Sequence, residues 1–143
     1  MTIEPMTAEG FAELATWRYD APYAFYDSEL EPVLNPERYF AARGDDGELA
    51  GFYYFEVKPD ALDYGLGLRP DLTGKGLGLD FFRTGLEFGR ERYRPPFARL
   101  FVAAFNGRAI KVYERAGFRE TGRHMRTFAR WGEVEFVNME EPH

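Results

Sequence analysis

The chain has 143 residues, of which 45% are hydrophobic, 29% charged and 17% aromatic, enough apolar material for one core and too much for a disordered chain. It has no cysteine and two histidines, which excludes disulfide scaffolds, thiolate metal sites, cysteine nucleophiles and histidine-rich metal centres. No apolar run is long enough to cross a bilayer, and the first residues do not resemble a secretory signal. We therefore expect one globular domain over residues 1–143, in the cytoplasm and without a membrane partner.

The formal net charge of −6 is unevenly distributed. Residues 1–66 hold 14 acidic and 4 basic side chains, whereas residues 67–143 hold 10 acidic and 14 basic ones. Such a chain can present a cationic site to a phosphorylated ligand and an anionic site to an amine, although two ordinary solvated surfaces would give the same counts. No nucleic-acid-reading motif accompanies the basic residues, so we expect no nucleic-acid partner.

The first half of the chain predicts a strand, a helix and a meander. A strand over 3–6 is followed by apolar residues at helical spacing, for which Thr7 is a candidate N-cap. The stretch 17–34 is irregular and rich in aromatic residues, and Asn35 followed by proline indicates a cap that opens a short helix. Three strands separated by turn residues then form an antiparallel meander over 39–43, 48–58 and 62–68.

In the second half the periodicity changes. From Leu77 onward apolar residues recur at spacings of three and four, which predicts a helix that ends before two consecutive prolines. A buried strand over 98–105 and a second helix over 108–116, stopped by Gly117, come next. Two more strands complete the chain. This order of elements predicts a domain of the α/β or α+β class with a mixed sheet.

The strongest motif is the glycine-rich segment that joins the strand ending at Leu68 to the long helix. Glycines at 74, 76 and 78 let successive N–H groups converge on an anion, the helix adds the positive end of its dipole, and Lys75 adds a full charge. A Walker A loop is excluded, because position 69 is not glycine and Gly76 stands where Ser or Thr is required. The G-x-G-x-G pattern also matches a dinucleotide fingerprint poorly, which leaves another kind of phosphate loop or an ordinary helix cap.

Residues Thr73–Gly78 resemble the coenzyme A pyrophosphate loop of the GNAT superfamily of N-acetyltransferases, [QR]-x-x-G-x-[GA], with Thr73 in place of the usual Gln or Arg. Residues Phe105–Phe118 are similar to the family's downstream N-x-x-A-x-x-x-Y-x-x-x-G-F segment, which begins here at Asn106. The resemblance implies a GNAT-type sheet, mostly antiparallel and flanked by helices, with acetyl-coenzyme A as cosubstrate and no metal. It also implies that the pyrophosphate is bound by Thr73, Gly74, Lys75, Gly76, Leu77 and Gly78.

Acetyl transfer from a thioester to an amine needs a base for the amine, donors for the oxyanion and an acid for the departing thiolate. By resemblance, the pantetheine lies between the fourth and fifth strands on backbone groups of Leu66, Gly67 and Leu68, and the amide near Leu66 or Gly67 polarises the thioester carbonyl. Tyr113 is the expected general acid. It lies on the same helix face as Asn106, which is a helix N-cap, a coenzyme contact or both.

The general base is less well defined. Asp63 is the only acid in the expected fourth strand and is the first candidate, with Glu56 on the preceding strand as the second. His124 is expected to be structural or exposed.

Gly65 and Gly67 lie within the expected fourth strand, and glycines at these positions are typical of a strand bulge.

The acceptor side is expected in the aromatic and acidic cluster Trp17–Asp27, which stands where the family builds an acceptor lid. Tyrosines and acids together suit an ammonium group, although the same residues could simply pack on the core. We expect an amine-bearing small molecule or peptide as the acceptor, and a homodimer is left open. The alternative function is a non-catalytic acyl-coenzyme A binding or sensing module on the same fold.

Overall fold

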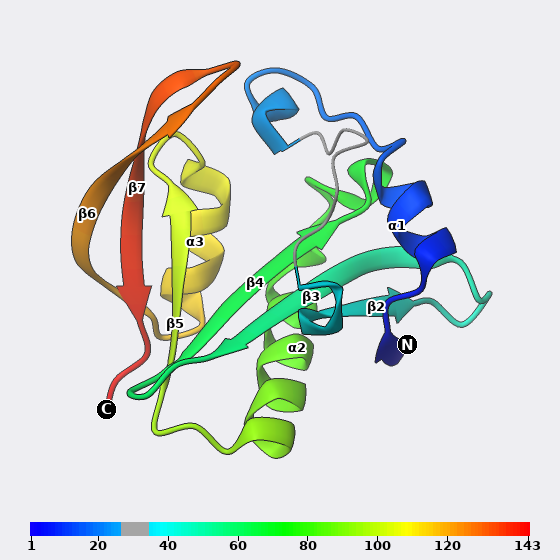
Figure 1. Cartoon of the computed structure of the whole chain (residues 1–143), viewed down its shortest axis with the longest axis horizontal. Coiled ribbons are helices and arrows are strands. Elements are labelled where there is room, and N and C mark those ends of the chain that lie inside the picture. The colour runs from blue at the N-terminus through cyan, green and yellow to red at the C-terminus, as the bar shows by residue number, and fades with distance from the viewer. Residues whose placement is uncertain (27–34) are drawn as a thin grey trace.

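The computed structural model describes residues 1–26 and 35–143. Its strands form one seven-stranded sheet in the order β1-β2-β3-β4-β5-β7-β6 (Figure 1). All neighbouring strands are antiparallel except β4 and β5, which are parallel. This sheet confirms the predicted fold class. The strands are β1 (Thr2–Pro5), β2 (Tyr39–Arg43), β3 (Leu49–Val57), β4 (Leu62–Leu68), β5 (Ala98–Ala103), β6 (Arg119–Phe128) and β7 (Gly132–Glu140).

Within residues 1–26 and 35–143, three α-helices cover the two faces of the sheet: α1 (Ala8–Leu14), α2 (Gly78–Tyr93) and α3 (Gly107–Arg115). The connections that the structure describes contain three short 3-10 helices: η1 (Tyr23–Tyr26), η2 (Pro36–Arg38) and η3 (Pro70–Leu72). No helix in the described part of the chain combines the length and the apolar character needed to cross a membrane.

Local capping explains where α1 begins and where α3 ends. The Thr7 hydroxyl accepts a hydrogen bond from the Gly10 N–H at 3.0 Å, as predicted for an N-cap. Helix α3 ends in a Schellman motif, because Gly117 has a φ of 98° and the Phe118 N–H donates to the Tyr113 carbonyl at 3.0 Å. The short helix expected after Asn35 is present, with Asn35 at the N-cap position and Pro36 in its first turn, but the Asn35 side chain makes no capping bond and its φ of 57° is left-handed rather than extended.

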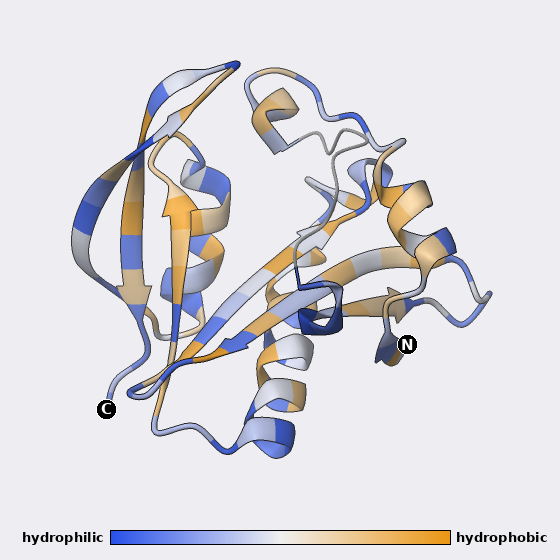
Figure 2. Cartoon of the chain, viewed as in Figure 1, coloured by the Kyte–Doolittle hydropathy of each residue, from blue (hydrophilic) through white to orange (hydrophobic). Residues whose placement is uncertain are grey.

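Alternation along the strands divides the core between the two faces of the sheet. The larger cluster combines Tyr53 and Phe55 of β3 with Phe82 and Leu86 of α2. The smaller cluster lies under α1 around the buried Trp17. Figure 2 shows the matching distribution of hydropathy, with an apolar β5 inside the sheet and a hydrophilic β6 at its edge.

Helix α2 packs closely on the sheet through Gly85. A Cβ atom at this position would lie 2.2 Å from Tyr53 Cε1 and 2.3 Å from the Tyr64 hydroxyl. These two tyrosines donate hydrogen bonds to the α2 carbonyls of Phe81 and Phe82, at 2.7 and 2.8 Å. The glycine therefore lets two buried hydroxyls reach the helix backbone and fixes α2, whose N-terminus carries the glycine loop.

The pairing of β4 with β5 is short. Their register contains only two pairs, Leu62 with Ala98 and Asp63 with Arg99, although both strands continue beyond them. The two strands then diverge, as Figure 1 shows. On its other side β4 pairs with β3 in an unbroken register from Leu62 to Leu68.

The unbroken register of β4 shows that the bulge predicted at Gly65 and Gly67 is wrong. Gly67 is required for another reason, because a Cβ atom there would lie 2.3 Å from Cε1 of Phe52 on β3. The two glycines lie on one face of the strand, where side chains of β3 cover them: Phe52 lies against Gly67 and Tyr54 against Gly65.

Candidate active site

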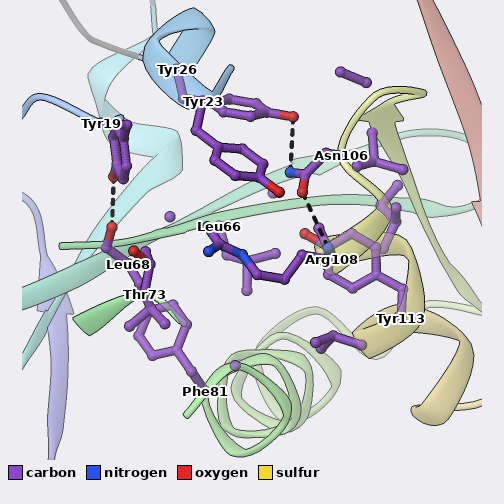
Figure 3. A pocket seen from close by; sticks show the side chains of 18 of the residues that line it. Tyr19, Tyr23, Tyr26, Leu66, Leu68, Thr73, Phe81, Asn106, Arg108 and Tyr113 are labelled. Atoms are coloured by element: carbon purple, nitrogen blue, oxygen red, sulfur yellow. Dashed lines mark hydrogen bonds between the residues drawn. The ribbon is translucent and has the colours of Figure 1, made fainter. Parts of the chain in front are cut away.

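The divergence of β4 and β5 opens a cavity of about 920 Å³ (Figure 3). Its walls are β4 and β5, the glycine loop with the start of α2, helix α3, and aromatic residues of the segment that follows α1. Most of the predicted coenzyme-binding residues meet around it, namely Leu66, Gly67, Leu68, Thr73, Gly74, Gly76, Gly78 and Asn106, together with Tyr113. The side chains of Lys75 and Leu77 are exposed and lie outside this lining.

The register of β4 decides which backbone groups face the cavity. The Arg69 N–H bonds the Ala50 carbonyl of β3, whereas the Leu62 N–H bonds the Phe97 carbonyl on the β5 side. Backbone groups alternate in direction along an antiparallel strand, so those of Leu66 and Leu68 point toward the gap and those of Gly67 point toward β3. Of the two amides predicted to meet the thioester carbonyl, only that of Leu66 has the required direction.

The glycine loop has the geometry of an anion site. Gly74 and Gly76 have φ angles of 71° and 77°, in the left-handed region that favours glycine. A Cβ atom at Gly76 would meet no protein atom within 4 Å. Within the described residues, the backbone N–H groups of residues 74–78 donate to no backbone carbonyl, so they remain available at the positive end of the α2 dipole.

Thr73 contributes in a different way from the Gln or Arg that it replaces. Its hydroxyl donates to the Pro70 carbonyl at 2.7 Å and closes the short helix η3. The Thr73 side chain therefore stabilises the turn that leads into the glycine loop.

Asn106 links the start of α3 to the aromatic segment that follows α1. Its Oδ1 accepts the Ala109 N–H at 3.1 Å, which confirms the N-cap, and its Nδ2 donates to the Tyr26 hydroxyl at 3.0 Å. Burial raises the pKa of the Tyr26 phenol, and the hydrogen bond with Asn106 opposes this shift.

Tyr113 extends from α3 into the cavity (Figure 3). Its ring lies 4.9 Å from the ring of Phe82, centroid to centroid, which fixes its direction. Burial raises the pKa of the Tyr113 phenol, so the hydroxyl keeps its proton at neutral pH.

Each tyrosine of the aromatic segment after α1 contacts another residue of the cavity lining. The Tyr19 hydroxyl donates to the Leu68 carbonyl at 2.6 Å, and the Arg108 guanidinium lies 4.3 Å from the centre of the Tyr23 ring. This places the predicted acceptor segment at the cavity. Residues 27–34 of the predicted irregular stretch, which include Asp27, lie outside the described residues.

The candidate bases lie elsewhere. Asp63 lies in the paired part of β4, where its carboxylate accepts the Arg99 Nε–H at 2.6 Å, and it does not line the cavity. Glu56 is opposite Asp63 on β3; ion pairing with Lys58 at 2.7 Å, among other contacts, holds its pKa below the usual range. These positions argue against both as general base.

His124 also lies outside the cavity lining. Its Nδ1 is 2.6 Å from Asn138 Oδ1, and its Nε2 accepts a hydrogen bond from Arg126 Nε–H at 2.8 Å. Both ring nitrogens are therefore engaged within the sheet, in line with the structural role expected from the sequence.

Sequence reasoning missed three cations on α3. Arg108, Lys111 and Arg115 all line the cavity. Their spacing of three and four residues places them on one helix face and was a signal available in the sequence.

Among the described residues, no group of three His, Asp or Glu side chains is arranged to hold a metal ion.

Comparison with known proteins agrees with this geometry. The model of the acetyltransferase (GNAT) family matches residues 8–118. Mycothiol acetyltransferases of Streptomyces coelicolor and Streptomyces avermitilis are 41% and 40% identical over 95 residues. Each alignment covers 64% of this chain and 30% of the relative, so the matched region spans less than a third of those proteins.

Two solved structures share the fold over almost the whole chain. A chimera of the Vibrio cholerae spermidine N-acetyltransferase with hSSAT superposes with a TM-score of 0.78 at 20% identity, covering 99% of this chain and 95% of the chimera. The V. cholerae enzyme in complex with CoA and spermine gives a TM-score of 0.74 at 20% identity, covering 97% and 93%. The matching family model extends from α1 through the glycine loop to the end of α3. The chain therefore belongs to the GNAT family of acetyltransferases, which use acetyl-coenzyme A as cosubstrate.

Proposed function

We propose that residues 1–143 form one acetyltransferase domain that transfers the acetyl group of acetyl-coenzyme A to the amine of a small molecule or peptide. The observation that carries this proposal is the continuity of a single cavity. It joins an anion-binding glycine loop, the outward-facing backbone of β4 and the side chain of Tyr113.

The residues present fit the coenzyme. The free N–H groups of the glycine loop suit the pyrophosphate, and the open space at Gly76 is where a side chain would block it. The outward-facing groups of Leu66 suit the amides of the pantetheine arm. When bound, the thioester supplies the acetyl group, with its carbonyl directed at the Leu66 N–H.

Tyr113 is the proposed general acid. In the transfer, the amine nitrogen forms a bond with the acetyl carbon and the carbon–sulfur bond breaks. The Tyr113 hydroxyl gives its proton to the departing sulfur. Since Asp63 and Glu56 are held in ion pairs outside the cavity, the surplus proton of the amine passes to water, and the Tyr113 phenolate takes up a proton from water to restore its hydroxyl.

The proposed acceptor class is supported by the relatives. Two neighbours with the same fold are named spermidine N-acetyltransferases, and the curated relatives are named mycothiol acetyltransferases. All of these names point to small molecules. One neighbour is described as dodecameric, which supports association between copies of this chain.

The proposal is tested by incubating the chain with acetyl-coenzyme A and a panel of primary amines, including spermidine, and by measuring the release of free thiol. Amine-dependent thiol release, with the acetylated amine detected by mass spectrometry, supports the proposal. Tight binding of acetyl-coenzyme A without turnover for any amine in the panel favours the non-catalytic binding module instead.

A further inference from the structure

The cavity passes through the sheet where β4 and β5 diverge. Leu100 and Val102 of β5 belong to the core cluster that packs on α2, and Phe101 between them points to the opposite face of the strand. All three line the cavity. Because the coenzyme is proposed to bind on the face that α2 and α3 cover, the acceptor reaches the thioester from the face on which Phe101 lies.

Phe101 lies close to the level of the proposed reaction centre. The parallel register pairs Leu62 with Ala98, and each strand advances by about 3.3 Å per residue. Phe101 therefore lies about one residue short of the level of Leu66, whose N–H is proposed to meet the thioester carbonyl. Phe136 of β7 lines the cavity as well, so that two phenyl rings form a wall beside the acceptor.

The guanidinium of Arg126 covers these two rings from the edge strand β6. Its Cζ lies 4.4 Å from the centre of the Phe136 ring and 5.3 Å from that of Phe101. Arg126 pairs with Val134, farther along the hairpin, so its side chain reaches back to the rim of the cavity. Among the described residues, no acid forms an ion pair with it.

His124 fixes the direction of this guanidinium. Arg126 Nε–H donates to His124 Nε2 at 2.8 Å, which places the imidazole proton on Nδ1, where it is donated to Asn138 Oδ1 at 2.6 Å. The His124 ring also stacks on Phe136, with 5.6 Å between centroids. The two Nη groups of Arg126 donate to no described residue. They form a planar pair of donors of the kind that binds a carboxylate.

The acids on this face of β3 and β4 are already paired. Asp63 is held by Arg99, and Glu56 by Lys58. The described residues that line the cavity include no carboxylate. An acceptor with several ammonium groups would therefore find no counter-charge among these residues, whereas an anionic group would find the Nη groups of Arg126.

We propose that the acceptor amine carries a carboxylate and that Arg126 binds this carboxylate at the rim of the cavity. The inference rests on the proposed function and names its substrate class, which is amino acids and related amino carboxylates rather than polyamines. The apolar part of such an acceptor lies against the rings of Phe101 and Phe136, between its amine and Arg126.

The test measures thiol release from acetyl-coenzyme A with matched pairs of acceptors. Glycine, β-alanine, 6-aminohexanoate and L-phenylalanine are each compared with the corresponding carboxamide, which keeps the amine and removes the negative charge. Spermidine is the polycationic acceptor. The measured quantity is the ratio of kcat/KM for each carboxylate to kcat/KM for its carboxamide. Comparing this ratio between proteins cancels the difference in reactivity between the two amines.

The proteins are the wild type, Arg126→Gln, Arg126→Lys and the control Arg123→Gln. Arg123 lies on the same strand, but its guanidinium is directed to Glu120 and Glu135. Charge-assisted hydrogen bonds are the stronger class, so the ratio for the preferred carboxylate should fall ~10-fold or more in Arg126→Gln, mainly through KM. Arg126→Lys should keep part of the ratio, and Arg123→Gln all of it.

An unchanged ratio in Arg126→Gln, or an equal fall in Arg123→Gln, overturns the inference. So does a wild type that acetylates spermidine better than every carboxylate. In these cases acetyl transfer still occurs, and the proposed function stands. If no amine of the panel gives thiol release, the proposed function is contradicted and the inference with it. Arg126 is exposed, and thermal unfolding verifies that its variants are folded.

Discussion

The anion site in the glycine loop is tested by Gly76→Ala, for which the chain offers a matched control. Gly76 and Gly132 have φ angles of 77° and 72°, and a Cβ atom at either position meets no atom within 4 Å. Gly132 opens β7 at the tip of the β6–β7 hairpin and does not line the cavity. The two substitutions therefore impose the same backbone strain, and only one of them lies where the pyrophosphate is proposed to bind.

The expected magnitudes follow from this match. An L-residue in the left-handed region costs about 1 kcal/mol or slightly more, so each variant should melt about 3 °C below the wild type for a chain of this size. Acetyl-coenzyme A at ~100 times its dissociation constant stabilises the protein that binds it by about 2.7 kcal/mol, or roughly 8 °C. We expect this shift in the wild type and in Gly132→Ala, and its loss in Gly76→Ala, whose methyl group would occupy the space of a phosphate oxygen.

The assay is thermal unfolding with and without acetyl-coenzyme A, with acetate as the ligand control. If Gly76→Ala keeps the full shift, the loop is an ordinary helix cap and the reasoning from its geometry is refuted. If Gly132→Ala loses the shift as well, backbone strain accounts for the effect, and the loop has not been shown to bind phosphate.

Three further outcomes are expected. Tyr113→Phe keeps the ring and removes the hydroxyl, so steady-state kinetics should show turnover ~10²- to 10⁴-fold slower with nearly unchanged binding of acetyl-coenzyme A; a wild-type rate would remove Tyr113 from the mechanism. Asp63→Asn should keep turnover near the wild-type rate, and a 100-fold loss would restore it as the base. Gly85→Ala should lower the free energy of unfolding by about 2 kcal/mol in urea titrations, because overpacking against Tyr53 and Tyr64 outweighs the gain in helix propensity; unchanged or increased stability would show that these rings can move aside.

Much of the fold is predictable from local signals in the sequence. Strands 39–43 and 62–68 have the predicted bounds, because turn residues limit them on both sides. Gly117 ends α3 as predicted, because a left-handed position after the last turn favours glycine. The two motifs of the glycine loop and of α3 also meet around one cavity, as the family resemblance implied.

The parts of the site that could not be predicted depend on strand register. The register with β3 decides which of Leu66 and Gly67 directs its N–H toward β3 and which directs it into the gap. No local sequence pattern carries that information. The role of Asp63 depends on its pairing with Arg99, which is 36 residues away in the sequence. Asp63, the acid expected as general base, is therefore paired with Arg99 across the junction of β4 and β5.

The two-residue pairing of β4 with β5 has a further consequence. The two parts of the sheet on either side are connected only by the pairing of Leu62 and Asp63 with Ala98 and Arg99. A ligand whose amide groups bond the free edge of β4 takes the place of a missing strand, in the manner of β-augmentation. The coenzyme would then complete the hydrogen bonding of the sheet as well as react. Its departure after each turnover would leave the edge of β4 beyond this pairing without a partner.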